Sequence, residues 1–170
     1  LNLGLNSEFL VDSNAKVAFS PTTPSVCAEG SKITVQGGGT LTAYETSFSG
    51  IGSWTGIIAE VGSNVRLTSA AVYDAEWALN AISSNLNIFH SSFNNCENGV
   101  KLVNCINYTL NDNYFNGKGT GVAVSLTEVA SNIIENNRIQ NFGTGVVMIT
   151  CSPKFISNTV TDNNHYGLEV

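Results

Sequence analysis

Short apolar and polar stretches alternate along the whole chain, and Asn, Gly or Ser separates one stretch from the next. The segment SNIIENNRIQNFGTGVVM (131–148) is typical, because two Asn stand between isoleucines and a Gly precedes three apolar residues. Asn is a poor helix former, whereas Ile and Val favour extended backbone. We therefore expect strand, turn and strand here rather than a helix.

One six-residue phrase recurs along the chain, and every copy except the first begins and ends on a large apolar residue. The copies are AYETSF (43–48), LTSAAV (67–72), IFHSSF (88–93), LNDNYF (110–115), IENNRI (134–139) and FISNTV (155–160). A second anchor runs in phase with them at Gly56, Trp77, Gly99, Gly121, Gly145 and Gly167. Two anchors that share a period of about 22 residues predict a β-solenoid with one coil per repeat.

The repeat predicts which side chains stack from coil to coil. Ser91, Asn113, Asn137 and Asn158 hold the same position in successive copies. An Asn side chain is both donor and acceptor, so it can bond to the same residue one coil above and below, and we expect an asparagine ladder. Positions one and three after the second anchor are nearly all apolar and are expected to point inward, with Asn80 as the exception.

The phrase, the ladder and the glycine anchors resemble those of the right-handed parallel β-helix repeat proteins, the pectin-lyase-like family, over about residues 31–170. The resemblance implies an all-β, right-handed parallel β-helix of about six coils in this region. Residues 1–30 are then expected to form an irregular N-terminal segment or cap. Lyases, hydrolases, epimerases, tailspikes and adhesins share the architecture, so the fold alone does not give the function.

A narrower resemblance is carried by SKITVQGGGTLTAY (31–44) and SWTGIIAEVGSNVRLTSAAVYDAEWAL (53–79). These two blocks are similar to β-helix segments of large exported surface proteins of Bacteroidota. The resemblance implies a secreted or cell-surface location.

Polarity in this chain is carried by amides and hydroxyls rather than by charges. Charged residues make up 12% of the chain, against about 25% in typical domains, while Asn supplies 22 positions. The formal net charge of -6, without any basic run, argues against nucleic acid and against an anionic membrane as partners. No apolar run approaches the roughly 20 residues of a membrane-spanning helix, so we expect no membrane insertion.

Candidate catalytic residues gather at one turn of the repeat. They are His90, Asp112, Glu135 and Arg138. Carboxylates from adjacent coils could stand about 5 to 6 Å apart, near the spacing in a retaining glycosidase. Arg138 beside acidic groups would suit β-elimination of a uronic acid. Outward columns must be polar in any case, however, and the Asp clusters of pectate lyases and the NTD, DD, GHG and RIK segments of polygalacturonases are absent.

The same outward face supplies the candidate ligand-binding residues. They are Asn111, Tyr114, Glu135 and Arg138. Trp54, with Tyr73 and Trp77 nearby, could add an aromatic platform for sugars.

The four cysteines, at positions 27, 96, 105 and 151, form no metal motif, because no C-x-x-C pair and no His companion occurs. Cys105 and Cys151 share a column two coils apart, about 9 to 10 Å, which is beyond the reach of a disulfide. We therefore expect buried free thiols, no metal site and no cofactor.

These observations favour a non-catalytic β-helical stalk or adhesive module of an exported cell-surface protein, with glycan or protein contact along one face. The alternative is a fragment of a polysaccharide lyase or glycoside hydrolase that acts on acidic polysaccharide. The chain ends on Gly167-Leu168-Glu169-Val170, which repeats the opening of a coil. We expect the helix to continue beyond this point and the isolated piece to self-associate through its uncapped C-terminal edge.

Overall fold

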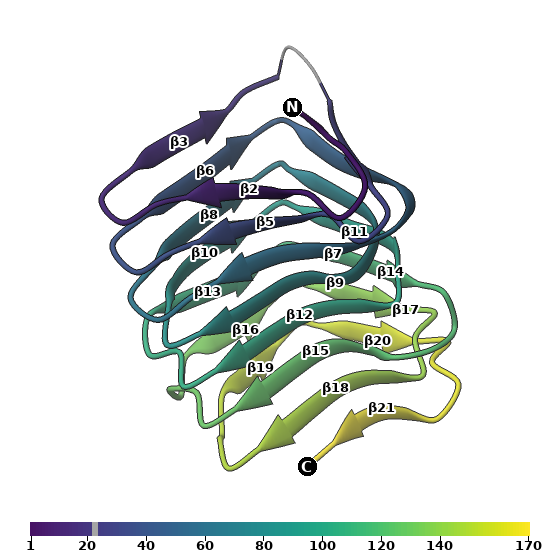
Figure 1. Ribbon diagram of the computed structural model, residues 1–170. Coiled ribbons are helices and arrows are strands. Elements are labelled where there is room, and N and C mark those ends of the chain that lie inside the picture. The colour runs from purple at the N-terminus through teal and green to yellow at the C-terminus, as the bar shows by residue number, and fades with distance from the viewer. Residues whose placement is uncertain (22–23) are drawn as a thin grey trace.

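Seven short strands stack into one side of a right-handed parallel β-helix in the computed structural model, which describes residues 1–21 and 24–170 (Figure 1). In spatial order they are β3 (Lys16–Phe19), β6 (Thr40–Tyr44), β8 (Asn64–Thr68), β10 (Asn85–Phe89), β13 (Tyr108–Asn111), β16 (Ile133–Glu135) and β19 (Lys154–Ile156). Neighbours pair in parallel and in register, so Ile88 lies between Leu67 and Leu110. We call this side the seven-stranded sheet.

A 14-stranded sheet forms the other two sides of the rod. The second side contains β1 (Asn2–Leu3), β4 (Ser25–Ala28), β11 (Ser92–Cys96), β14 (Tyr114–Gly117), β17 (Arg138–Gln140) and β20 (Thr159–Thr161). The third side contains β2 (Glu8–Val11), β5 (Lys32–Val35), β12 (Asn98–Val103), β15 (Val122–Thr127), β18 (Thr144–Ile149) and β21 (Tyr166–Glu169). The long strands β7 (Ser47–Ala59) and β9 (Ala71–Ile82) bend around the corner and join both sides.

The chain makes about eight turns, more than the six expected. The difference arises partly in residues 1–30, where the prediction of an irregular segment was wrong. Strands β2, β3 and β4 form a coil there and pair in register with β5, β6 and β7. The segments EFLV and KVAF alternate in burial as strands do, but their coil lacks the anchor residues that revealed the later repeats. The described residues contain no helix that is long and apolar enough to cross a membrane.

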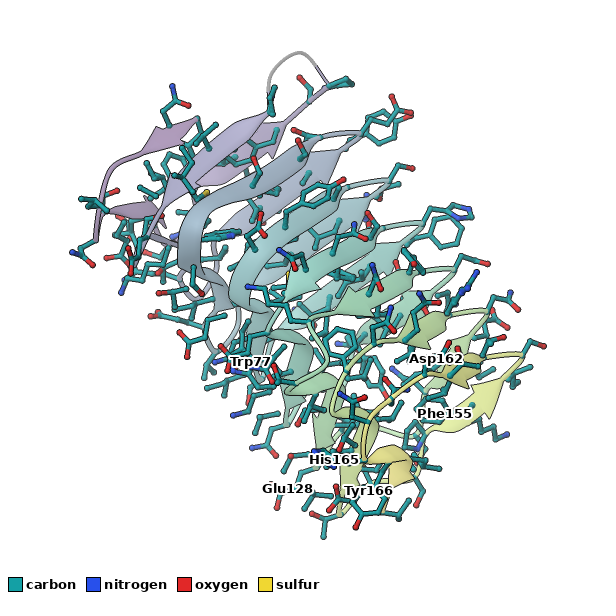
Figure 2. The ribbon with its side chains drawn as sticks, turned by 90° about the vertical axis from the view of Figure 1, so that its right-hand side faces the viewer. Trp77, Glu128, Phe155, Asp162, His165 and Tyr166 are labelled. Carbon is teal, nitrogen blue, oxygen red and sulfur yellow. The ribbon has the colours of Figure 1, made fainter. Side chains whose placement is uncertain are left out.

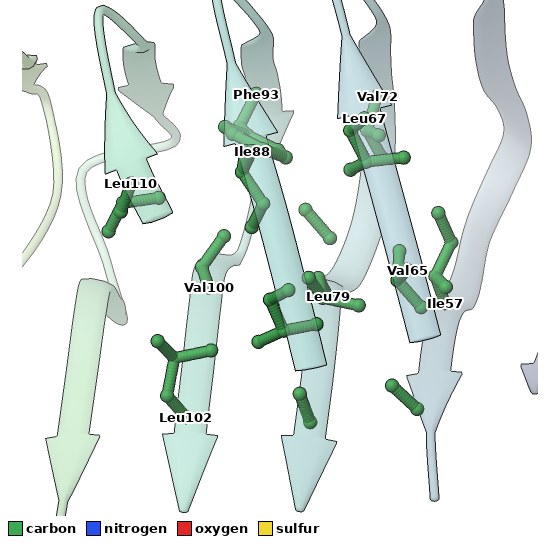
Figure 3. Close-up of a cluster of buried hydrophobic side chains, with 14 of the residues drawn as sticks. Ile57, Val65, Leu67, Val72, Leu79, Ile88, Phe93, Val100, Leu102 and Leu110 are labelled. Atoms are coloured by element: carbon green, nitrogen blue, oxygen red, sulfur yellow. The ribbon is translucent and has the colours of Figure 1, made fainter. Parts of the chain in front are cut away.

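The core runs along the axis of the rod as stacked columns of apolar side chains (Figure 3). Ile88, Leu110 and Phe93 are fully buried, and the rings of Phe93 and Phe115 stack with centroids 4.8 Å apart. The predicted stack of Leu168 above Val146 is confirmed by the pairing of β21 with β18.

For two of the six predicted anchors, Trp77 and Gly121, the inward positions counted from the anchor were wrong. Leu79 pairs with Ile57 and Val100, so the inward residue after Trp77 is Leu79, and Asn80 faces outward beside Lys101. A register shift in the pairing of β7 with β9 causes this offset. In the next coil Val124, rather than Val122, pairs with Val100, because the turn before β15 is longer.

Each corner of the rod contains a residue with left-handed backbone. At the corner between the seven-stranded sheet and the second side, the φ values are 51° at Ser69, 49° at His90, 57° at Asp112 and 57° at Asn136. The N–H of each of these residues donates to a carbonyl of the next coil, for example from Asp112 to Glu135 over 3.0 Å. Short polar residues are favoured here because they tolerate this conformation better than most residues do.

The asparagine ladder lies one residue after this left-handed position and is confirmed. Asn113 and Asn137 are each 2% exposed. The Asn137 Oδ1 accepts from the backbone N–H of Asn113 at 2.9 Å and from its Nδ2 at 3.1 Å, and Asn158 does the same for Asn137. The Nδ2 of Asn137 also donates to the carbonyl of Leu110 at 2.8 Å, so the side chain satisfies two backbone groups of the preceding coil inside the rod.

Substitution Asn137→Ala is expected to lower the free energy of unfolding by about 2 to 4 kcal/mol, because the buried N–H of Asn113 and carbonyl of Leu110 both lose a partner. Asn137→Asp should cost at least as much as Ala, because it places a buried carboxylate oxygen against the carbonyls of Leu110 and Glu135. Asn87→Ala is the control, since this amide is exposed on the seven-stranded sheet and its loss should change stability by less than about 0.5 kcal/mol. Urea unfolding followed by circular dichroism measures all three, and equal midpoints for Asn137→Ala and Asn87→Ala would contradict the structural role of the ladder.

Candidate functional site

An open groove of about 770 Å³ crosses the outer surface of the seven-stranded sheet. Its floor consists of side chains that point away from the core on β6, β8, β10 and β13, and the turns before β13 and β16 add Ile106 and Asn132. The outward residues of the floor include Thr42, Asn87 and Thr109. Because strands of one sheet are rigid and evenly spaced, the groove presents its polar groups in fixed rows.

A second asparagine row, on the outer surface, forms one edge of this groove. Asn64, Asn85 and Asn107 occupy paired positions on β8, on β10 and just before β13. The Asn85 Nδ2 donates to Asn64 Oδ1 at 3.1 Å, and the Asn107 Nδ2 donates to Asn85 Oδ1 at 3.0 Å. Asn85, the interior amide of the row, still has one N–H and one oxygen lone pair for a ligand.

The charged and aromatic groups near the groove are few. Lys16 and Arg66 line it, and no Asp or Glu is among its lining residues. Tyr44, 48% exposed, and Phe89 point outward one column further along the same strands. The sequence analysis missed this surface because it searched for charged residues. Asn64, Asn85 and Asn107 are 21 and 22 residues apart, so the repeat period of about 22 residues could have revealed them.

The sequence-predicted site residues lie beside the groove, around the corner between the seven-stranded sheet and the second side. Asn111 and Glu135 end paired strands of the seven-stranded sheet, and Tyr114 and Arg138 begin paired strands of the second side. His90 and Asp112 hold the left-handed turn positions between the two sides. These two positions are therefore polar because the left-handed backbone favours short polar residues, whether or not a ligand binds there.

The structure joins these residues in two separate pairs. The Asn111 Nδ2 donates to Glu135 Oε1 at 3.2 Å, while the guanidinium of Arg138 lies 5.8 Å from the centre of the Tyr114 ring. The Nε of Arg138 donates to Gln140 at 2.8 Å, away from Glu135. Asp112 is one position beyond the pairing partner of Glu135, so the two carboxylates are not directly opposite each other. None of these residues lines the large groove.

Three further residues lie away from any shared site. Trp54 is fully buried and its indole N–H donates to the carbonyl of Tyr73 at 2.8 Å, so it cannot serve as a sugar platform. Trp77 lies on the third side, where the ammonium of Lys101 is 5.7 Å from its ring centre. His165 lies in the last turn beside Tyr166 (Figure 2), several coils from His90.

The four thiols are free, and three of them are buried. Burial raises the pKa of both Cys27 and Cys96 to about 11, and it also raises the pKa of Cys105. Cys105 and Cys151 occupy the same corner with Val129 of the intervening coil between them, and their Sγ atoms contact the carbonyls of Ala81 and Leu126. The predicted free thiols are thus confirmed, with Cys151 only partly buried.

A comparison with models of protein families shows which family this chain belongs to. The model of the periplasmic copper-binding protein (NosD) family matches residues 31–170. The chain belongs to this family. Membership of the NosD family agrees with the parallel β-helix and with an exported protein. No curated protein and no solved structure matches the chain.

The copper in the NosD family name can be tested against the side chains of this chain. Copper in proteins is held by thiolate, thioether or imidazole groups that converge on one point. No group of three or more His, Cys, Asp or Glu residues that could hold a metal occurs in the part of the chain that the structure describes. Met148 and Cys151 are near in sequence, but both histidines lie on other turns. The residues present therefore do not fit a copper centre.

The thiols are expected to differ in their reaction with a disulfide reagent. With a pKa of about 11, roughly one Cys27 or Cys96 thiol in a thousand is ionised at pH 8, and the neighbouring atoms also block access. Native protein treated with Ellman's reagent at pH 8 should release about one equivalent quickly, from Cys151, and the rest only in denaturant. Cys151→Ser should remove the fast phase. Four equally fast thiols would contradict the buried arrangement.

This chain is expected not to retain copper. Mixed anaerobically with Cu(I) and bicinchoninate at pH 7, it should leave the absorbance of the Cu(I) complex unchanged, because Val129 separates Cys105 from Cys151 and the described residues contain no cluster of three possible ligands. The denatured chain is the control, since its four freed thiols can compete for the metal. Stoichiometric withdrawal of copper by the folded chain would show that the ligand geometry described above is incomplete.

Proposed function

We propose that the chain is a non-catalytic β-helical module of an exported protein and that it binds a polysaccharide along the seven-stranded sheet. The observation that carries this proposal is the open groove of about 770 Å³ with its rows of amides and hydroxyls. An open groove without end walls suits a polymer, which can enter from the side and continue past both ends.

The chemistry of the groove suits sugar hydroxyls. A hydroxyl both donates and accepts, and the amides of Asn64, Asn85 and Asn107 offer both functions at each rung. Because neighbouring amides already bond to each other, little side-chain entropy is lost when a ligand binds. The outward rings of Tyr44 and Phe89 supply apolar faces on which sugar rings can stack.

The alternative function, a polysaccharide lyase or glycoside hydrolase, needs an acid, a base and a charge-stabilising group around one bound sugar. The candidates are divided between two sides of the rod, with Glu135 bonded to Asn111 and Arg138 bonded to Gln140. This division supports the module over the enzyme. A ligand that leaves the groove toward the second side would meet Asn111, Tyr114, Glu135 and Arg138, and we retain these four as a rim of the proposed site.

Affinity electrophoresis against dextran, glucomannan, polygalacturonate and alginate tests the binding proposal. We expect at least one polymer to retard the chain, and the double variant Asn85→Ala/Asn107→Ala to weaken that binding about tenfold or more, because two rungs lose their hydrogen bonds. Asn94→Ala, the same change on the second side, should bind as the parent does. Four polymers without effect, or equal losses in both variants, would overturn the proposal.

The same incubations test turnover. Neither unsaturated product nor new reducing ends should form from the two uronates. Turnover that disappears in Asp112→Asn or Glu135→Gln would instead establish the enzymatic alternative.

A further inference from the structure

Charge is distributed unevenly over the three sides of the rod. The strands of the seven-stranded sheet contain three basic residues, Lys16, Arg66 and Lys154, and one acidic residue, Glu135. The whole chain has seven basic and thirteen acidic residues, so these strands carry a local positive excess on an acidic protein, while the turns that border them hold Asp12, Glu45, Glu60, Asp112 and Glu128. The negative net charge of the chain alone would predict that anionic ligands are repelled.

Three acidic groups lie together at another corner. A second groove, between the second and third sides, is lined by Glu29, Glu76 and Glu97. An anionic polymer within a Debye length of that corner, about 8 Å at physiological ionic strength, is repelled by its carboxylates, whereas Lys16 and Arg66 attract it to the groove on the seven-stranded sheet.

Arg66 is one of the two cations that line the groove on the seven-stranded sheet. It lies on β8 with an exposed side chain, between Thr42 on β6 and Asn87 on β10. Within residues 1–21 and 24–170 the ion pair between Lys32 and Glu8 is the one formed, so the guanidinium of Arg66 remains available. Its planar fork can bond two oxygens of one carboxylate or sulfate.

A second cation stands at a distance that suits a polymer. Lys16 is on β3, two strands from Arg66, which corresponds to about 9 to 10 Å along the rod axis. A polymer that runs across the strands would therefore meet Lys16 and Arg66 at separate sugar units. Thr40 and Thr42 of β6 lie between these two charges, and the amide row begins at Asn64, on the strand of Arg66, and continues away from Lys16.

We infer that the polysaccharide bound by this groove is anionic, with carboxylate or sulfate groups on its sugar units, and that Arg66 is the residue that selects for this charge. The inference rests on the proposed function, since it names the ligand class of the same groove. It adds a charge preference that sugar binding by amides alone would not produce.

The test is isothermal titration of the full chain with three polymers. Polygalacturonate carries carboxylates, its fully methyl-esterified form has the same backbone without charge, and dextran sulfate carries sulfates. We expect polygalacturonate or dextran sulfate to bind at least tenfold more tightly than the methyl ester, and the stronger of the two identifies the anionic group. An increase in salt from 50 to 300 mM should weaken this binding several-fold and leave the methyl ester unaffected.

Variants assign the charge preference to Arg66. Arg66→Gln should weaken anionic binding about tenfold or more without changing the affinity for the methyl ester, and Arg66→Lys should restore part of the loss. Lys101→Gln, on the third side, removes one positive charge elsewhere and should bind as the parent does. Unchanged circular dichroism of each variant excludes a folding defect as the cause.

The outcomes separate the two claims. Equal affinity for charged and esterified polymer overturns the anionic preference while polysaccharide binding stands, whereas binding of no polymer overturns both. A loss in Arg138→Gln with none in Arg66→Gln would move the charge-selecting site to the corner and overturn the role of Arg66. Equal affinity for an oligonucleotide of matched charge would show a general polyanion surface and overturn selection for sugars.

Discussion

The whole rod depends on the left-handed backbone at its corners. A parallel coil must turn sharply three times, and at each turn a residue adopts a positive φ, including Asp74, Asn104 and Asp112. This conformation costs a residue with a Cβ about 1 to 2 kcal/mol, so each coil can form only if its neighbours compensate for that cost. They do so through the corner N–H groups, which donate to carbonyls of the next coil. Among the described residues, six of the 22 Asn hold such left-handed positions, which accounts for part of the high Asn content.

The residue after the left-handed position determines what fills the inside of a corner. At one corner it is the ladder of Asn113 and Asn137, whose amides bond to backbone groups of the preceding coil and to the next amide of the ladder. At the corner between the third side and the seven-stranded sheet the equivalent column contains Ser63 and Ser84, bonded to each other, and then Cys105. Cys105 thus occupies a small inward position where serine is an alternative, and this accounts for its burial without a metal.

Fold class, coil length and ladder could be predicted from the sequence because each appears in every repeat. The register around Trp77 and before Val124 could not, because a strand irregularity and a longer turn shift the anchor without breaking the apolar pattern. The first coil was missed since its corners and strands are short and carry no copy of the repeated phrase. The groove depends on which outward residues meet across strands, and that pairing requires the register. A local excess of positive charge on an acidic chain likewise follows from placement rather than from composition.

The in-register pairing of the seven-stranded sheet has a consequence for how such a protein can change over generations. Asn64, Asn85 and Asn107 are separated by single coils, and each coil brings its own share of core, corner and outer surface. Duplication of the DNA for one coil would therefore lengthen the interior and the outer groove together, in a single genetic event, without redesign of either. Deletion of one coil would shorten both. Natural length variants of such a rod can thus differ in the length of polymer that they bind, while each coil keeps the same outward side chains.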